Sequence, residues 1–157
     1  MATTNLSAYD KSGIPDASHL QFGLVVSEWN PGITENLFKG AKQALLENGV
    51  KETNIHRLNV PGSFELIFGC KTLLKKNQFD ALIAIGSVIQ GETRHFDFVC
   101  HAVSQGIKDL NLHYDTPTVF CVLTDNTMQQ AIDRSGGKFG NKGVDCAIAA
   151  IKMATLS

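Results

Sequence analysis

The sequence predicts an α/β protein in which helices cover both faces of a four-stranded parallel sheet. Short apolar runs alternate four times with amphipathic segments of helix length. The runs are rich in branched side chains, as buried parallel strands are. Strands that alternate with helices in this way imply right-handed crossovers and parallel pairing. At 157 residues the chain is long enough for one domain with a substantial core.

The first half of the chain contains two predicted strands and two predicted helices. Leu20 to Ser27 is a buried strand, and the following helix buries one face: Ile33, Leu37, Ala41, Ala44 and Leu45. That helix ends near Asn48-Gly49, a pair that commonly caps helices. Asn54 to Val60 is a more polar strand suited to a sheet edge. Phe64 to Lys76 is predicted as the second helix.

The second half repeats the pattern twice more. Phe79 to Val88 is the most apolar strand and is placed centrally. A helix runs from about Arg94 to Leu112, with a predicted inward stripe of Phe98, Ala102, Gln105 or Gly106, and Leu110. Thr118 to Leu123 is the fourth strand. Asn126, with Gln129 as its partner, is predicted to cap a short helix ending at Arg134. A glycine-rich break then precedes a last helix, Lys142 to Ala154.

Composition excludes several classes of protein. The formal net charge of -1 gives no electrostatic signature for nucleic acid or an anionic membrane. The four cysteines are widely spaced without a CxxC pair, so we expect buried free thiols and neither a zinc knuckle nor a redox dithiol. No apolar run approaches a membrane span, and the start has no signal-peptide pattern. We therefore expect a cytoplasmic protein, with residues 1–18 as a flexible N-terminal arm and residues 19–157 as a single domain.

Polar residues follow each predicted strand and should converge at one edge of the sheet. In parallel sheets, ligands bind outside the carboxyl ends of the strands. The segments collected there are Trp29-Asn30, Gly62 to Glu65, Val88 to His95, and Thr124-Asp125. This edge is the predicted binding site.

The segment Gly91 to His95 joins the central strand to the next helix and suits an anion. Free backbone amides at a helix start, with the Thr93 hydroxyl, can hold a phosphate. From spacing alone, Thr93 is more often a simple helix cap. The helix dipole and Arg94 favour a neutral imidazole at His95, which can accept a proton. A lone histidine in such a position is nevertheless more often an inert surface residue.

Two further residues have both a structural and a functional interpretation. Trp29 lies in a turn after a buried strand, where it either packs on the next loop or stacks on a flat heteroaromatic ring. Glu65 begins a helix, where it either complements the helix dipole or accepts hydrogen bonds from ligand hydroxyls. Neither a GxxxxGK[ST] nor a GxGxxG pattern occurs, so the sequence does not predict a nucleotide-binding loop.

Three motifs resemble one known family, the lumazine synthases. They are Pro-Gly-Ser-Phe-Glu at 61–65, Gly-Ser-Val-Ile-Gln-Gly-Glu-Thr-Arg-His-Phe at 86–96, and Ala-Ile-Asp-Arg-Ser-Gly-Gly-Lys-Phe-Gly-Asn-Lys-Gly at 131–143. The similarity extends from about Phe22 to Ala154, in order and with compatible spacing. It implies a flavodoxin-like three-layer α/β/α sandwich. It also implies a transferase of riboflavin biosynthesis that joins two small-molecule substrates, 5-amino-6-ribitylaminouracil and 3,4-dihydroxy-2-butanone 4-phosphate, without a metal or organic cofactor.

The resemblance also implies roles for individual residues. Trp29 takes the ring-stacking position, where phenylalanine is commoner, and His95 takes the proton-transfer position. The remaining substrate-binding positions are Asn30, Ser63, Phe64, Glu65, Val88, Ile89, Phe120 and Lys142, and the phosphate-binding positions are Glu92, Thr93 and Arg134. Of these, Phe120, Arg134 and Lys142 match residues that the family supplies from a neighbouring subunit.

Members of this family assemble, so the resemblance implies a homo-pentamer, a 60-subunit icosahedral shell, and association with riboflavin synthase. The break at 136–143 is short, as in shell-forming members. The family's N-terminal arm usually adds a strand to a neighbour's sheet, whereas residues 1–18 contain Gly13 and Pro15 and make a poor strand.

Two other functions compete with the synthase. A flavin-binding storage shell would keep the site without catalysis, with Trp29 stacked on the flavin. A response-regulator-like module would share the topology, but the first strand ends with a single acidic residue, Glu28, in place of an acidic cluster.

Overall fold

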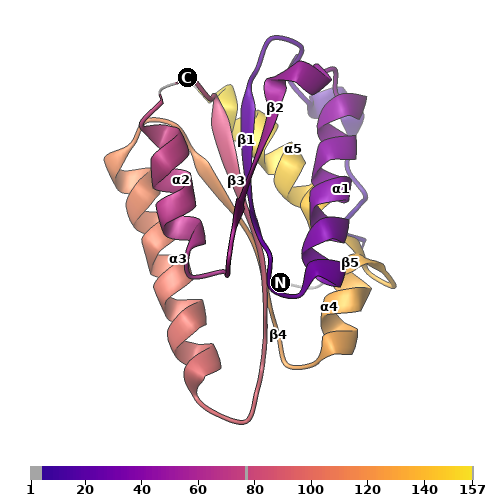
Figure 1. The fold of residues 1–157 in the computed structure, drawn as a ribbon. Coiled ribbons are helices and arrows are strands. Elements are labelled where there is room, and N and C mark those ends of the chain that lie inside the picture. The colour runs from indigo at the N-terminus through magenta and orange to yellow at the C-terminus, as the bar shows by residue number, and fades with distance from the viewer. Residues whose placement is uncertain (1–4, 77, 157) are drawn as a thin grey trace.

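The protein is a three-layer α/β/α sandwich, as the sequence predicts (Figure 1). The computed structural model describes residues 5–76 and 78–156, so residues 1–4 of the predicted arm lie outside the described residues. The principal elements are β1 (Phe22–Ser27), α1 (Pro31–Glu47), β2 (Ile55–Val60), α2 (Leu66–Leu74), β3 (Ala81–Ile89), α3 (His95–His113), β4 (Thr118–Asp125), α4 (Met128–Arg134), β5 (Ser135–Gly137), β6 (Gly140–Asn141) and α5 (Lys142–Ala154). Short 3-10 turns cover Lys11–Gly13 and Glu52–Asn54.

The main sheet has four parallel strands in the order β2-β1-β3-β4. This order confirms that β3 is internal and that the polar strand β2 is at an edge. The chain moves from β1 outward to β2 and then crosses to the other side of β1 for β3. The gap between the ends of β1 and β3 is therefore the topological switch point at which ligands bind in such sheets.

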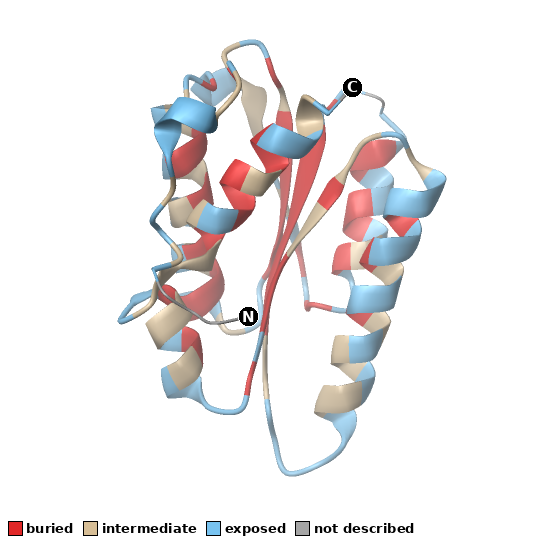
Figure 2. Cartoon of the chain, turned by 180° about the vertical axis from the view of Figure 1, so that it is seen from behind, coloured by how far each residue is buried: buried red, intermediate tan, exposed pale blue. Residues whose placement is uncertain are grey.

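Two apolar cores lie on opposite faces of the sheet (Figure 2). One packs under α1 and α5, with Phe22, Leu37 and Ile151 fully buried. The other packs under α2 and α3, with Val25, Leu66 and Val103 fully buried. Every residue of β1 is buried, as expected of an internal strand between helical layers.

The inward face of α3 differs from the predicted one. Its buried residues are Val103, Ile107 and Leu110, whereas Phe98 is 68% exposed. The first two turns of α3 contain no buried residue. Phe98 is large and apolar but points away from the core, and in the first two turns Val99 packs against the core while only partly buried.

Other boundaries also shift. The cap of α4 is Thr127, whose hydroxyl accepts a hydrogen bond from the backbone N–H of Gln130 at 3.2 Å, so the predicted Asn126–Gln129 pair is wrong by one residue. The helix predicted from Phe64 begins at Leu66. The glycine-rich break forms an antiparallel hairpin of β5 and β6.

The described part of the N-terminal arm lies on its own subunit. The Leu6 N–H donates to the carbonyl of Phe139 at 2.7 Å, and the Ser7 hydroxyl accepts from the Asn141 N–H at 2.9 Å. Ala17 is fully buried in the core under α1, although the whole segment was expected to remain outside the core.

Three of the four cysteines are buried and free, as predicted, whereas Cys100 is only partly buried. Burial raises the pKa of the Cys70 thiol to about 12, so this thiol is inert at neutral pH. None of the described helices is long and apolar enough to cross a membrane.

An ion pair fastens the edge strand β2 to α1. Arg57 donates to both carboxylate oxygens of Glu35 and lies 4.4 Å from the centre of the Phe38 ring. The hydrogen bond from Arg57 outweighs partial burial and holds the pKa of the Glu35 carboxyl below its usual value. A carboxyl group whose pKa is lowered by folding stabilises the fold at pH values above its unfolded-state pKa. This stabilisation is lost as the pH falls through the folded-state pKa.

We therefore expect Glu35→Gln to lower the free energy of unfolding by about 0.5 kcal/mol at neutral pH, because the pair is partly exposed and screened. The difference should vanish in acid, where the wild-type carboxyl is protonated. Denaturant unfolding at the two pH values measures it. Glu47→Gln is the control, because Glu47 accepts from Gln43 on the same helix and has no ion pair among the described residues. Equal losses at both pH values would contradict the electrostatic origin.

Candidate active site

A cavity of about 620 Å³ opens at the switch point between β1 and β3. Its walls come from the turn after β1, the loop before α2, the end of β3 and the first turns of α3. The lining residues are Trp29, Asn30, Gly62, Ser63, Phe64, Glu65, Ser87, Val88, Ile89, His95 and Val99. Eight of the predicted site residues are among them: Trp29, Asn30, Ser63, Phe64, Glu65, Val88, Ile89 and His95.

Asn30 fixes the wall that follows β1. Its backbone is left-handed, with φ 56°, a conformation that asparagine tolerates better than most residues. The side-chain Nδ2 donates to the carbonyl of Ser87 at 3.0 Å and so ties the end of β1 to the end of β3. Pro31 then occupies the first turn of α1, where its missing N–H is not needed.

The structure confirms the packing interpretation of Trp29, and its stacking on a ligand stays a prediction. A Cβ placed on Gly62 would lie 3.2 Å from the Trp29 ring, so the indole packs by its edge on the loop before α2. The side chain is nevertheless 71% exposed, which leaves a broad aromatic surface for a planar ligand.

Gly86 in β3 packs closely against Ser63, a residue of the cavity wall. A Cβ at this position would lie 2.6 Å from the Ser63 hydroxyl oxygen, so only glycine fits without displacing Ser63. The Ser63 Oγ is buried and has no hydrogen-bond partner among the described residues. An unpaired buried hydroxyl at a cavity wall favours a polar ligand at that point, because such a group costs free energy when left unpaired.

His95 projects from the first turn of α3 at the cavity rim and is exposed. Its backbone N–H lies 3.4 Å from the Thr93 hydroxyl, so Thr93 contributes a weak cap to α3. Thr93 and Glu92 are exposed on the loop beside the cavity and are not among its lining residues. The loop is thus open to solvent in the single subunit.

The other predicted residues lie elsewhere in the subunit. Phe120 belongs to the edge strand β4, Arg134 ends α4 and Lys142 begins α5. None of the three lines the cavity. Burial is the largest single effect and disfavours the Lys142 ammonium, but the hydrogen bond to Asp145 and the electrostatic effects of Cys146, Asp145 and Cys121 together outweigh it, so the pKa of Lys142 lies above its usual value.

The sequence analysis placed Gly62 at this edge without giving it a role, and it missed two lining residues, Ser87 and Val99. Val99 lies one helical turn after His95, so the i,i+4 spacing could have identified it. The described residues contain no cluster of three or more His, Cys, Asp or Glu side chains that could hold a metal ion.

The fold and the cavity define an α/β sandwich with an open pocket at the carboxyl ends of its strands, lined by an exposed indole and polar side chains. Residues 19–157 match the family model described as 6,7-dimethyl-8-ribityllumazine synthase. The chain belongs to this family.

Individual relatives agree. The chain is 62% identical to the 6,7-dimethyl-8-ribityllumazine synthase of Christiangramia forsetii, across 99% of this chain and 95% of the relative. It is 63% identical to the enzyme of that name from Flavobacterium johnsoniae, across 98% of this chain and 82% of the relative. It is 53% identical to the Parabacteroides distasonis protein of that name, across 100% of this chain and 99% of the relative.

Proposed function

We propose that the protein condenses 5-amino-6-ribitylaminouracil with 3,4-dihydroxy-2-butanone 4-phosphate to form 6,7-dimethyl-8-ribityllumazine, with release of phosphate and water. The observation that carries this proposal is the cavity at the switch point, where four separate segments bring together an aromatic surface, polar groups and a histidine. Membership of the synthase family supports the same reaction. Association with riboflavin synthase is a part of the proposal that rests on the resemblance alone, and a cytoplasmic location is proposed from the sequence.

The cavity residues divide into ring-binding and chain-binding groups. Trp29 stacks on the pyrimidine, and Val88 and Ile89 supply the apolar wall beside it. Asn30, Ser63, Phe64 and Glu65 surround the ribityl chain and the pyrimidine edge, where the unpaired Ser63 hydroxyl gains a partner.

His95 carries the proton transfers. Formation of the imine, elimination of phosphate and closure of the ring each move protons between neighbouring heteroatoms and carbons. The imidazole accepts and returns these protons while the cavity holds the two substrates in contact.

The phosphate of the second substrate binds between Glu92-Thr93 of one subunit and Arg134 of its neighbour. Backbone amides at the start of α3 and a guanidinium fork both suit phosphate oxygens. Phe120 and Lys142 of the neighbour complete the site. Support comes from the sheet order, which places the cavity at β1 and β3 and puts Phe120 on the free edge strand β4.

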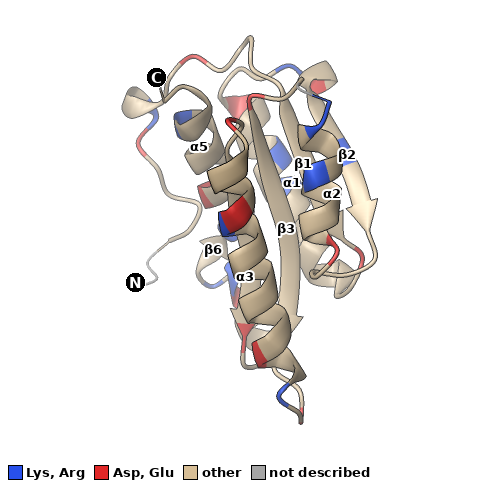
Figure 3. Cartoon of the chain, turned by 90° about the vertical axis from the view of Figure 1, so that its left-hand side faces the viewer, with Lys and Arg blue, Asp and Glu red and all other residues tan. Residues whose placement is uncertain are grey.

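A homo-pentamer that builds a 60-subunit icosahedral shell provides that neighbour. The outer face of α2 and α3 carries exposed Phe68, Phe98 and Leu112, and Figure 3 shows few charged residues on it. Apolar surface of this kind favours burial in a subunit interface. Native mass spectrometry or light scattering measures the assembly.

The product assay tests the proposed reaction. We expect the protein mixed with both substrates to generate the fluorescent lumazine, and omission of either substrate to abolish it. The exposed Trp29 surface also suits a flavin, so a storage shell is the second candidate function. Tight riboflavin binding without lumazine formation would favour storage and contradict the synthase.

A further inference from the structure

A buried carboxylate at the end of β4 has no role in the scheme above. Asp125 is the last residue of β4, and its side chain is only 8% exposed. Its Oδ2 has no hydrogen-bond partner among the described residues. A buried charge with incomplete hydrogen bonding is costly unless a nearby cation uses it.

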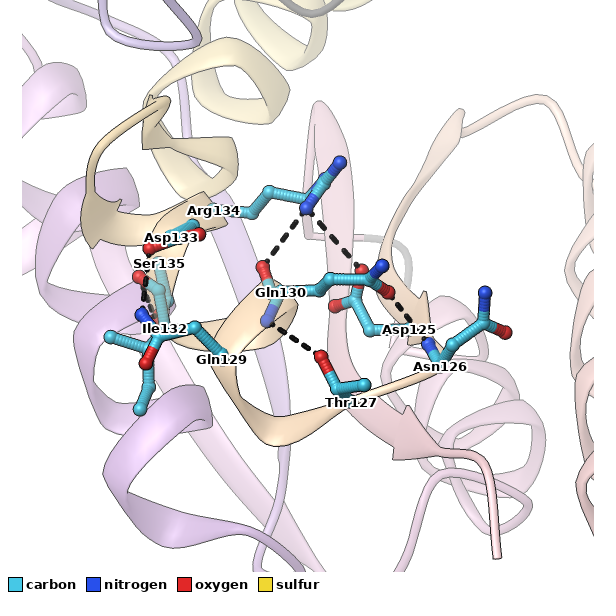
Figure 4. Close-up of polar contacts among 9 residues, drawn as sticks. All are labelled: Asp125, Asn126, Thr127, Gln129, Gln130, Ile132, Asp133, Arg134 and Ser135. Carbon is cyan, nitrogen blue, oxygen red and sulfur yellow. Dashed lines mark hydrogen bonds and ion pairs between the residues drawn. The ribbon is translucent and has the colours of Figure 1, made fainter.

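That cation is Arg134, one short helix further along the chain. Its Nη1 lies 3.9 Å from Asp125 Oδ1 and donates to the carbonyl of Gln130 at 3.1 Å (Figure 4). The guanidinium carbon also lies 5.2 Å from the centre of the Phe139 ring. One end of the guanidinium is therefore held by a carboxylate, a carbonyl and an aromatic ring.

The geometry of this contact is fixed by the capping of α4. Thr127 accepts from the backbone N–H of Gln130, and the Gln130 side chain accepts from the N–H of Asn126 at 2.8 Å. These two bonds join the start of α4 rigidly to the end of β4. Asp125 precedes α4 and Arg134 ends it, and the capped helix holds their side chains facing each other, as Figure 4 shows.

The other edge of the guanidinium is free for an anion. Nε and Nη2 make no hydrogen bond within the described residues, and Figure 4 shows the second terminal nitrogen directed away from Asp125 and Gln130. Two donors on one edge of a guanidinium can bind two phosphate oxygens in parallel. The contacts of Nη1 would determine the direction in which the edge formed by Nε and Nη2 points.

We propose that Asp125 is a positioning residue, which orients Arg134 so that its free edge meets the phosphate of the substrate bound by the adjacent subunit. The inference rests on the proposed function, in which Arg134 binds that phosphate. Burial raises the pKa of the Asp125 carboxyl, and the nearby charge of Arg134 lowers it in part. Asp125 also offsets some positive charge, and the test separates this effect from orientation.

The first variant is Asp125→Asn, which keeps the shape and removes the charge. We expect the KM for the phosphorylated substrate to rise about tenfold, since hydrogen bonds to charged groups are the stronger ones. The KM for the pyrimidine substrate should change less than about twofold, because the Asp125 side chain does not line the cavity. Asp133→Asn is the matched control: Asp133 lies on the same helix but binds Gln129 at 2.9 Å, and its KM values should equal those of wild type.

A double-mutant cycle distinguishes positioning from a merely structural role. Arg134→Lys replaces the planar fork with a single ammonium, which has no edge to orient. In that background, Asp125→Asn should have no further effect on the phosphate-dependent KM. The same tenfold rise in both backgrounds would overturn the inference, as would a lowered KM in the single variant, because charge offset would then dominate. Competition by inorganic phosphate should weaken in parallel with the KM.

Asp125→Glu is the second variant, in case Asp125→Asn does not assemble. It retains the charge but displaces the carboxylate by one methylene, so the KM for the phosphorylated substrate should again rise; an unchanged KM would overturn the inference. Absence of lumazine formation by the wild-type protein would instead contradict the proposed function itself.

Discussion

His95→Ala is expected to lower kcat about a hundredfold or more while KM for each substrate stays close to that of wild type. General acid–base catalysis by a positioned side chain contributes this much or more to a rate. The side chain lies at the cavity rim and is exposed, so its removal leaves the core intact. Steady-state formation of the lumazine measures both constants.

His101→Ala is the matched control for this prediction. His101 lies on the same helix and is exposed, but its ring Nδ1 contacts the carbonyl of Asp97 at 2.7 Å and it does not line the cavity. Its kcat should equal that of wild type. Normal turnover by His95→Ala, or an equal loss in His101→Ala, would remove His95 from the mechanism.

The second large effect is complementation between two inactive variants. His95→Ala and Arg134→Ala should each have little activity alone. After mixed refolding, a cavity with an intact His95 will often face a neighbour with an intact Arg134. If equal amounts of the two variants assemble at random in a cyclic oligomer, about one interface in four combines an intact His95 with an intact Arg134. The mixture should therefore recover about a quarter of the wild-type activity.

This result would separate a shared site from one contained within a single subunit. If Arg134 acted in its own subunit, no mixture would exceed the activity of its components. A mixture of His95→Ala with His95→Ala,Arg134→Ala is the control, because every cavity then lacks the histidine. Activity should depend on mixing during refolding and not on mixing of assembled proteins.

The layers of the fold were predictable because apolar runs and amphipathic helices leave few alternatives. The buried face of α3 was not predictable, because Phe98 and Val103 are both apolar and periodicity does not reveal which turns face the sheet. The Thr127 cap was missed because Asn126 and Thr127 are both good capping residues. Choosing between them needs the backbone conformation at the end of β4, which tertiary packing sets.

The cavity was predictable in part, from topology and from the motifs together. Parallel strands bring their carboxyl ends to one edge, so the order of strands and helices along the chain is enough to place Trp29 near Val88. Spacing alone left His95 undecided, and the resemblance supplied its role. The link between Asp125 and Arg134 could not be foreseen, since nothing in the sequence shows that the carboxyl is buried or lacks a partner.

The two ends of the chain are unequal as attachment points for a tag or cargo. Leu6 and Ser7 bond the hairpin that carries Phe139, and Phe139 supports the Arg134 side chain. A bulky fusion at the amino terminus would therefore disturb a segment next to Arg134, the arginine proposed to bind phosphate. The last residues follow α5 at the opposite end of the sheet from the cavity, and Leu156 is 73% exposed (Figure 1). Genetic fusions to this scaffold should accordingly extend from its carboxyl terminus.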